Sequence, residues 1–411
     1  MINTDKKFNG MLLERKNLDW LWYLVVFFLS LNFMAKSNFL LLSLFTGGII
    51  VAFYKKSRFR ITTEFVLIWL FSIAYYLLLI QYTYGGIGAL FTYLIGPVTI
   101  YFMGYTVVKG NTGFIFKTVL MIIMGNFIHG TLNMIKYFQR YGFISTVAGP
   151  RIIPDIWTGV EFTATIQGTK FTLMLGLLFY SILLITNKGN KKFGFLIILL
   201  IIFSLFVAFI LGNRTAIAIL LINFAANIVL YNFSCKKFDQ NRFKVINFIL
   251  FILLIIFVFY TSNIFNIKEF IQSSTWYLRS NSMELTDDPR IEAYKNVLVQ
   301  IVRYPLGGYR MHLGNVNYVH NLWLDVIYAT GLIPFIFLVL YTLQVMYSLL
   351  EVIRNNYISI DLKILLFSTY LAFILNFMVE PILEGVPFMF LSFCLINGMV
   401  KKYLEIFKKI S

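Results

Sequence analysis

Long runs of apolar residues recur almost from one end of the chain to the other, separated by short polar segments. Most of these runs contain roughly 17–23 residues, which is enough for a helix to cross about 30 Å of hydrocarbon. The pattern predicts twelve membrane-spanning helices, at about 20–35, 38–54, 61–80, 90–108, 113–135, 168–186, 193–211, 215–231, 245–262, 320–350, 362–379 and 386–400. The predicted fold class is therefore an all-α polytopic membrane protein.

Two longer polar segments, 136–167 and 263–319, interrupt this rhythm. The second is far longer than an ordinary connection, so it is either functional or disordered. Asp287-Asp288-Pro289 has the features of a helix start, and apolar residues follow at helical spacing from Ile291 to Val302. We therefore expect an amphipathic helix that ends near Tyr304-Pro305 and lies on the outer surface or over a cavity.

These two segments divide the chain into five parts. They are the N-terminal transmembrane helices (1–135), an external loop (136–167), transmembrane helices that include a Gly-Asn-Arg-Thr sequence (168–262), a large external loop (263–319), and the C-terminal helices with a cytoplasmic tail (320–411).

Composition and charge support a membrane protein. Hydrophobic residues make up 59% of the 411 residues and charged residues 13%, which excludes soluble folds and disorder because soluble domains carry about twice that charged fraction. A net charge of +17 would suggest nucleic acid in a soluble protein. Here most lysines and arginines fall in alternate loops on the side of the N-terminus, which predicts that both termini are cytoplasmic. The charge is thus a signal of topology, and we expect no nucleic-acid partner.

Arginines dominate the basic residues predicted to lie outside. They are Arg140, Arg151, Arg214, Arg279, Arg290, Arg303 and Arg310. The planar guanidinium suits bidentate binding of phosphate, whereas the cytoplasmic segments mostly use lysine. Alternatively, some of these arginines pair with nearby acids or reach lipid headgroups.

Arg214 is the most informative of them, because it lies in Gly212-Asn213-Arg214-Thr215 at the outer junction of two apolar runs with almost no loop between them. An unpaired guanidinium is costly there, so we expect an anion or a carboxylate beside it. The alternative is a simple topology anchor.

A candidate base follows the large loop. His320 opens the tenth run at the predicted water interface, and imidazole is the natural general base near neutral pH. Asn321 and Asp325 lie one helical turn apart and could bind an acceptor hydroxyl. Glu380, at the outer end of the eleventh run, is a second candidate base. An interfacial histidine and a plain helix terminus are the alternatives.

The C-terminal half, about 160–400, resembles the O-antigen ligase/polymerase superfamily. The similar segments are Gly212-Asn213-Arg214-Thr215-Ala216, Arg303-Tyr304-Pro305-Leu306-Gly307-Gly308-Tyr309, His320-Asn321-Leu322-Trp323-Leu324, Gly331, and Glu380 before Pro387. The order of these motifs, their predicted topology and the large outer loop all agree with that family.

This resemblance implies a glycosyltransferase that polymerises lipid-linked repeat units of O-antigen, capsule or a similar exopolysaccharide. Such proteins transfer a glycan from undecaprenyl diphosphate to an acceptor sugar on the outer face of the bacterial cytoplasmic (inner) membrane. We expect Arg214, Arg279, Arg303 and Arg310 to bind the diphosphate, and His320 or Glu380 to act as base. We expect no metal or other cofactor. Expected partners are membrane lipids, the lipid-linked oligosaccharide and, in the cell, a chain-length regulator and a flippase.

Two alternatives stay open. A glycan ligase of the same superfamily would move a finished chain onto another acceptor. A flippase or transporter of lipid-linked oligosaccharide belongs to another class, and it would place its functional charges near the middle of the membrane on broken helices.

Overall fold

A computed structural model describes residues 19–35, 60–83, 86–108, 112–142, 150–186, 190–234, 240–282 and 289–408. The predicted span 38–54 lies outside these residues, as do Asp287 and Asp288. The first half of the chain forms the helices Asp19–Ser30, α3 (Thr63–Tyr82), α4 (Ile87–Ala89), α5 (Gly96–Val107), α6 (Thr112–Tyr141), α7 (Ala164–Leu175), α8 (Leu178–Thr186), α9 (Lys191–Leu211), α10 (Arg214–Ser234) and α11 (Gln240–Thr261). A π-helical segment, Leu90–Ile95, joins α4 to α5.

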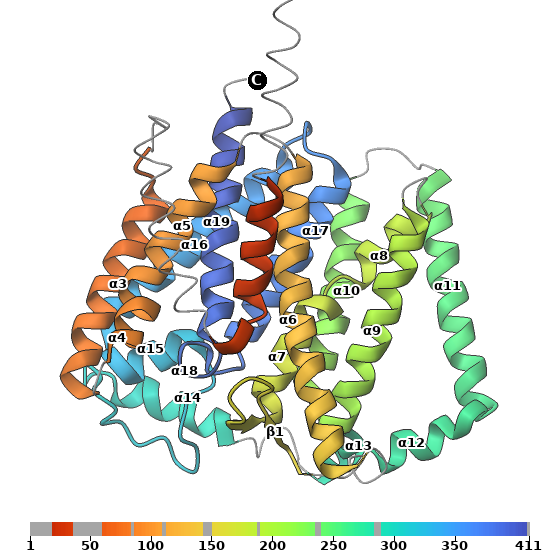
Figure 1. The fold of residues 1–411 in the computed structure, drawn as a ribbon, viewed down its shortest axis with the longest axis horizontal. Helices are drawn as coiled ribbons and strands as arrows, with labels where there is room; N and C mark the ends of the chain where they lie inside the picture. Colours follow the sequence, from red (N-terminus) through yellow and green to blue (C-terminus); the bar gives the residue numbers. More distant parts are fainter. Residues whose placement is uncertain are drawn as a thin grey trace, which may run out of the picture.

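In the second half, the described residues form five short helices and three long ones. The short helices are α12 (Ile267–Ser273), α13 (Thr275–Ser282), α14 (Pro289–Gln300), α15 (Leu322–Thr330) and α18 (Ile382–Gly385), and the long ones are α16 (Leu332–Arg354), α17 (Ile360–Phe377) and α19 (Pro387–Phe407). The long helices form one bundle, and the short helices α12, α13 and α14 gather at the end opposite the C-terminus (Figure 1).

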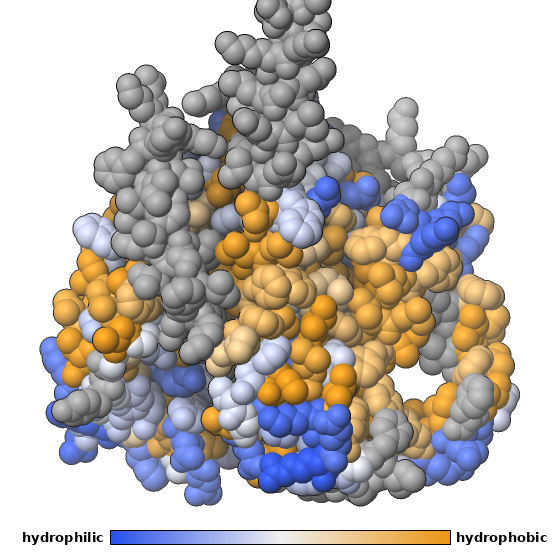
Figure 2. All heavy atoms as spheres, in the orientation of Figure 1, coloured by the Kyte–Doolittle hydropathy of each residue, from blue (hydrophilic) through white to orange (hydrophobic). Residues whose placement is uncertain are grey.

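Eight helical segments of the described chain are long and apolar enough to cross a membrane. They are Thr63–Tyr82, Ile87–Val107, Thr112–Tyr141, Ala164–Thr186, Lys191–Leu211, Arg214–Phe233, Leu332–Arg354 and Ile360–Phe377. On the face that Figure 2 shows, hydrophobic side chains cover the middle of the bundle and hydrophilic ones lie towards its ends. The all-α, multi-pass membrane architecture is thereby confirmed, whereas the number twelve stays a prediction.

The tenth predicted span, 320–350, is not one continuous helix. It is divided at Gly331 into α15 and α16. Gly331 has a left-handed φ of +82°, and a Cβ placed there would lie 2.2 Å from the carbonyl oxygen of Pro305. The backbone N–H of Leu332 donates to that same oxygen (2.9 Å). The segment around Pro305 thus packs into the break, which periodicity alone could not show.

The described parts of the two long polar segments lie at the same end of the bundle (Figure 1). In the first, strands β1 (Ile152–Pro154) and β2 (Glu161–Thr163) pair antiparallel, with Ile152 opposite Thr163. In the second, α14 occupies Pro289–Gln300, and its last helical residue is Gln300 rather than one near Tyr304-Pro305. The residues just before Pro289 lie outside the described ones, so the start at Pro289 stays a prediction.

Helix α14 buries a narrower face than its periodicity predicts. Ala293 and Val297, one turn apart, are buried in a small cluster with residues of the following loop. Leu298 and Val302 of the predicted apolar set are instead 58% and 86% exposed. One face of α14 therefore packs against the loop that follows it, and other apolar side chains of this segment stay exposed.

Glycines let α5 and α19 approach closely in the core. A Cβ at Gly104 would lie 2.2 Å from the carbonyl oxygen of Leu395, and one at Gly398 would lie 2.1 Å from that of Tyr101. Small residues at such crossings are typical of helices packed within a membrane. This contact holds the C-terminal helix against the N-terminal half.

Candidate functional site

The Gly-Asn-Arg-Thr sequence forms a tight connection between α9 and α10. Gly212 ends α9 in the left-handed conformation (φ +60°), which glycine adopts without strain. The side-chain oxygen of Asn213 accepts the N–H of Ala216 (3.0 Å) and so caps α10. Arg214 is consequently fixed as the first residue of α10, at the end of the bundle where the long loops gather.

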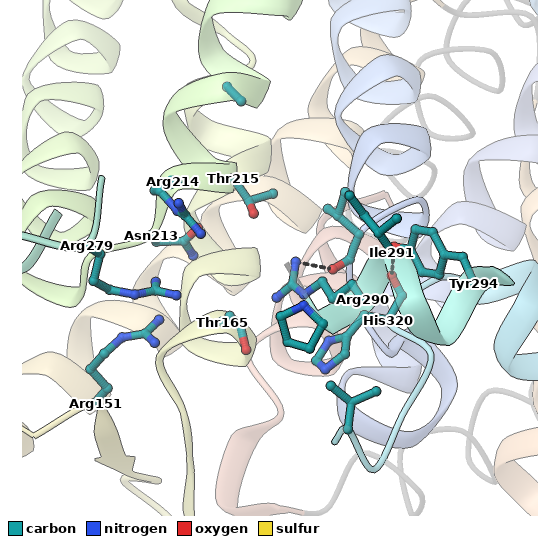
Figure 3. A pocket seen from close by; sticks show the side chains of 14 residues that line it. Arg151, Thr165, Asn213, Arg214, Thr215, Arg279, Arg290, Ile291, Tyr294 and His320 are labelled. Carbon is teal, nitrogen blue, oxygen red and sulfur yellow. Dashed lines mark hydrogen bonds between the residues drawn. The ribbon is translucent and has the colours of Figure 1, made fainter. Parts of the chain in front are cut away.

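Beside this junction lies a cavity of about 490 Å³. Four of its lining residues are arginines from four different parts of the chain: Arg151, which precedes β1, Arg214 of α10, Arg279 of α13 and Arg290 of α14. His320 also lines it. Figure 3 shows Arg151, Arg214 and Arg279 on one side of the cavity, with Arg290, His320 and Tyr294 facing them from the other.

Backbone carbonyls hold three of these arginines in place. Arg151 Nε donates to the carbonyl of Leu211 (3.0 Å) and Arg279 Nη1 to that of Gly212 (2.7 Å), so both grip the turn that carries Arg214. On the opposite side, Arg290 Nη1 donates to the carbonyl of Val379 (3.1 Å). These bonds to backbone oxygens orient the three guanidinium groups.

The charges of the four arginines repel one another. Burial, and then the positive charges of Arg279 and Arg290, lower the pKa of Arg151 to about 10. Within the described residues, neither Arg151 nor Arg214 forms an ion pair with a carboxylate. An anion in the cavity would relieve this repulsion and supply the partner that the sequence predicts for Arg214.

His320 faces the cavity with a carboxylate behind it. Its Nδ1 lies 3.9 Å from Oε2 of Glu380, a side chain that is only 1% exposed. Within the described part of the chain, His320 Nδ1 and both carboxylate oxygens of Glu380 lack a hydrogen-bond partner. A shift of about 0.7 Å would bring the two groups into hydrogen-bonding distance.

The backbone around His320 is tightly held. His320 has a left-handed φ of +58°, which is uncommon for a residue other than glycine. Tyr294 Oη lies 3.0 Å from the carbonyl oxygen of His320. The side chain of Asn321 caps α15 by accepting the N–H of Leu324 (3.2 Å), and its Nδ2 donates to the carbonyl of Met378 (3.2 Å).

Asp325 is placed behind this loop rather than in the cavity. It is 2% exposed, and its carboxylate accepts the backbone N–H groups of Val319 (2.8 Å) and Asn321 (3.2 Å). Both neighbours of His320 in the chain are thus bound by one carboxylate. The geometry makes Asp325 a residue that positions the His320 loop, and Asn321 a helix cap.

Arg303 and Arg310, two of the predicted diphosphate ligands, do not line the cavity. Both are exposed, and their guanidinium groups lie over the rings of Tyr304 (5.5 Å) and Tyr82 (5.7 Å). The reason is the length of α14, whose 12 residues separate its two ends by about 18 Å. Arg290 lies at the end near the cavity, and Arg303 follows the other end.

Arg151 and Arg290 take the places that the sequence suggested for Arg303 and Arg310. Both belong to the arginines that the sequence predicts to lie outside, but nothing in their local sequence distinguishes them from the rest. The sequence does give one signal for Arg290. It follows Pro289 in the first turn of a helix that the sequence predicts, and that helix is expected to lie on the outer surface or over a cavity. The position of Arg151 depends on how the β1–β2 hairpin packs against the bundle, and no short stretch of sequence indicates that packing.

Within the described residues there is no group of three or more His, Cys, Asp or Glu side chains that could hold a metal ion. The arrangement instead provides several fixed guanidinium groups around one space, with an imidazole and a buried carboxylate at its edge. Such a site can bind a polyanion and remove a proton from a group held beside it.

No protein-family model matches this chain, and no curated protein matches it significantly. The resemblance to the O-antigen ligase/polymerase superfamily therefore stays a prediction from the motifs, while the multi-pass helical membrane architecture rests on the structure itself.

Proposed function

We propose that this protein polymerises lipid-linked oligosaccharide repeat units in a bacterial cytoplasmic membrane. In this proposal the arginine-lined end of the bundle faces outward and both termini lie in the cytoplasm. The donor is a glycan on undecaprenyl diphosphate, and the acceptor is a sugar hydroxyl of a second glycan. The product would be O-antigen, capsule or a similar exopolysaccharide.

The observation that carries this proposal is the convergence of four arginines on one cavity. A diphosphate leaving group carries several negative charges, and guanidinium forks bind phosphate oxygens in pairs. A cavity of about 490 Å³ is also within the usual range for small-ligand sites. Because three of the four arginines are held by backbone carbonyls, they can stabilise charge that develops on the leaving diphosphate with little reorganisation.

His320 is the proposed base. The acceptor hydroxyl gives its proton to the imidazole while its oxygen bonds to the anomeric carbon of the donor sugar. The bond from that carbon to the diphosphate oxygen breaks, and the diphosphate leaves with the bonding electrons. The carboxylate of Glu380, 3.9 Å away, stabilises the imidazolium that forms. No metal or cofactor is part of this step.

A ligase of the same superfamily would use the same donor site with a different acceptor, so the arginine cavity supports it equally. A transporter of the same substrate is favoured by a separate observation. Lys170 and His129 are ionisable side chains buried within the spans α7 and α6. Such groups often lie on a translocation path.

Purified protein, reconstituted with a synthetic undecaprenyl-diphosphate-linked repeat unit, tests the proposal. Polymerase activity would give a ladder of longer glycans by electrophoresis or mass spectrometry, and addition of a lipid A-core acceptor distinguishes a ligase. Substrate that stays unchanged in active membranes would contradict the proposal. Movement of substrate across the vesicle membrane without elongation would instead identify a transporter.

A further inference from the structure

A second cavity, of about 320 Å³, lies on another side of the first turns of α7. Thr165 lines the arginine cavity, whereas its neighbour Ile166 and the later residue Lys170 line this second one. Helices α6 and α7 pack on each other beside β1 (Figure 1). His129 and Asp155 also line this cavity. The proposed transfer uses none of these residues.

Three buried side chains form a chain of hydrogen bonds there. Lys170 Nζ lies 2.8 Å from His129 Nδ1, and His129 Nε2 lies 2.8 Å from Asp155 Oδ2. Because an ammonium group has donors only, Nδ1 of His129 must accept and Nε2 must carry the proton that it donates to Asp155. The imidazole is therefore neutral and links one positive to one negative charge.

The carboxylate of Asp155 is occupied by the protein. Its Oδ1 accepts the backbone N–H groups of Trp157 and Thr158, at 3.0 Å each, and the Thr158 hydroxyl at 3.1 Å. Although burial acts in the opposite direction, these bonds and the bond from His129 hold the pKa of Asp155 below its usual range. Asp155 stays charged and balances Lys170.

The two cavities thus differ in charge. The first presents four guanidinium groups, while the titratable groups that line the second, among the described residues, are Lys170, His129 and Asp155, whose charges sum to zero. Because these charges cancel, the second cavity would offer an anion little electrostatic attraction. Asn126 and Thr158 add donors and acceptors to its wall, and Phe162 and Phe388 add apolar surface. Such a mixture is suited to a neutral ring that bears hydroxyl groups on its edges and C–H groups on its faces.

We propose that the second cavity binds a sugar unit, with Lys170 donating a hydrogen bond to one of its hydroxyls. In the transfer proposed above, on which this assignment rests, the bound unit belongs to the acceptor glycan. His129 and Asp155 position the ammonium group. The cavity volume exceeds the smallest usual small-ligand sites and can hold a monosaccharide ring.

Binding of the repeat-unit oligosaccharide, released from the host cell's own surface polysaccharide, tests this assignment by calorimetry. The purified protein is kept in a detergent without a sugar headgroup, because such a headgroup would compete. Lys170→Met removes the donor at nearly constant length, and we expect roughly 10–100-fold weaker binding because a hydrogen bond from a charged group is lost. Val160→Trp, at a lining residue that is 65% exposed, should obstruct the cavity and also weaken binding.

Lys136→Met is the matched control. Lys136 donates to the backbone carbonyl of Asp155 (2.9 Å) but does not line the cavity, so its loss should leave oligosaccharide binding unchanged. If Lys170→Met does not fold, Val160→Trp decides the question because it leaves the buried residues intact. Equal oligosaccharide binding by wild type and Val160→Trp would overturn the assignment.

Undecaprenyl diphosphate, titrated into the same variants, separates this inference from the proposed function. We expect all of them to bind it as the wild type does, since the arginine cavity is unchanged. A wild-type protein that binds undecaprenyl diphosphate but not the oligosaccharide would overturn the second site and leave the proposed function standing. If the wild type does not bind undecaprenyl diphosphate, the proposed function fails.

Discussion

At the scale of single residues, the candidate site combines arginines that are held by backbone carbonyls with a histidine and a glutamate whose facing atoms are not hydrogen-bonded within the described chain. Arg151 and Arg279 are tied to the carbonyls of Leu211 and Gly212, so the positions of their charges are fixed before any ligand binds. The imidazole Nδ1 of His320 and the carboxylate of Glu380 are instead left 3.9 Å apart, and these side-chain atoms have no hydrogen-bond partner among the described residues. Fixed cations suit binding, and a base that can still gain a partner suits proton transfer.

Arg214→Ala and His320→Ala should each lower the rate of glycan elongation by roughly 100-fold or more, because each removes a group that acts in the transition state. Amounts of protein in the membrane should not change. The chain-length distribution of surface polysaccharide in cells measures the effect. Full-length distributions in both variants would show that these residues are not the site, even if the protein proves to be a polymerase.

Arg290 and Arg303 provide a matched pair of substitutions on either end of α14. Arg290→Ala should strongly reduce binding of undecaprenyl diphosphate, since Arg290 lines the cavity. Arg303→Ala should have little effect, because Arg303 is exposed and lies over Tyr304. Titration of the lipid into both purified variants gives the comparison. The opposite result would support Arg303 as a ligand of the diphosphate, as the sequence predicts.

Glu384, on the short helix α18, should make stability depend on pH. Burial raises the pKa of its carboxyl to about 7, and Oε2 has no hydrogen-bond partner in the described structure. The folded state therefore holds this proton more tightly than the unfolded state, so stability should fall as pH rises from about 4.5 to about 7. Thermal unfolding in detergent across this range should show that trend in the wild type and a weaker one in Glu384→Gln. Equal slopes would exclude Glu384 as the cause.

At the scale of elements, glycines decide which helices can meet. The pattern of apolar residues predicted where most long helices lie, and it also predicted the short helix α14. It did not predict that α15 and α16 are separate, because the break depends on Pro305 packing against Gly331. Both positions belong to motifs recognised in the sequence, but their contact is a tertiary event.

Gly398→Val should destabilise the protein by about 1–3 kcal/mol, the usual cost of overpacking a core. A Cβ at this position would lie 2.1 Å from the carbonyl oxygen of Tyr101, so α5 and α19 would have to separate. Gly86→Ala is the control, because nothing lies within 4 Å of a Cβ at Gly86. Thermal unfolding of the two variants in detergent measures the difference. Equal loss of stability in both would contradict the close-packing argument.

At the scale of the whole molecule, the structure places both long polar segments and the arginine cavity at one end of the bundle (Figure 1). The distribution of lysine and arginine predicts that this end faces outward. The proposed chemistry requires it, because the glycan is polymerised on the outer side. Topology is therefore a test that does not depend on knowing the sugar.

Single cysteines, introduced after replacing Cys235 and Cys394, should report the two sides of the membrane. Val302→Cys, after α14, should react with a membrane-impermeant maleimide in intact cells, since Val302 is 86% exposed. Tyr357→Cys, between α16 and α17 and 76% exposed in the wild type, should react only after the cells are opened. The reverse pattern would place the cavity in the cytoplasm and exclude an outward-facing transfer.

The sequence by itself determined the class of the protein and the kind of chemistry to look for. The bilayer requires each span to have a minimum apolar length, and it favours Lys and Arg in the loops on one side. Both features can therefore be recognised in short stretches of sequence. Arg214 and His320 were also found this way, because each lies in a short motif. Arg279 lies in no motif and was selected only as one of the arginines predicted to lie outside. Only the tertiary structure decided which arginines meet, since Arg151 and Arg290 reach the cavity through the packing of a hairpin and the direction of one helix. The same packing joined Lys170, His129 and Asp155, whose separation along the chain conceals their contact.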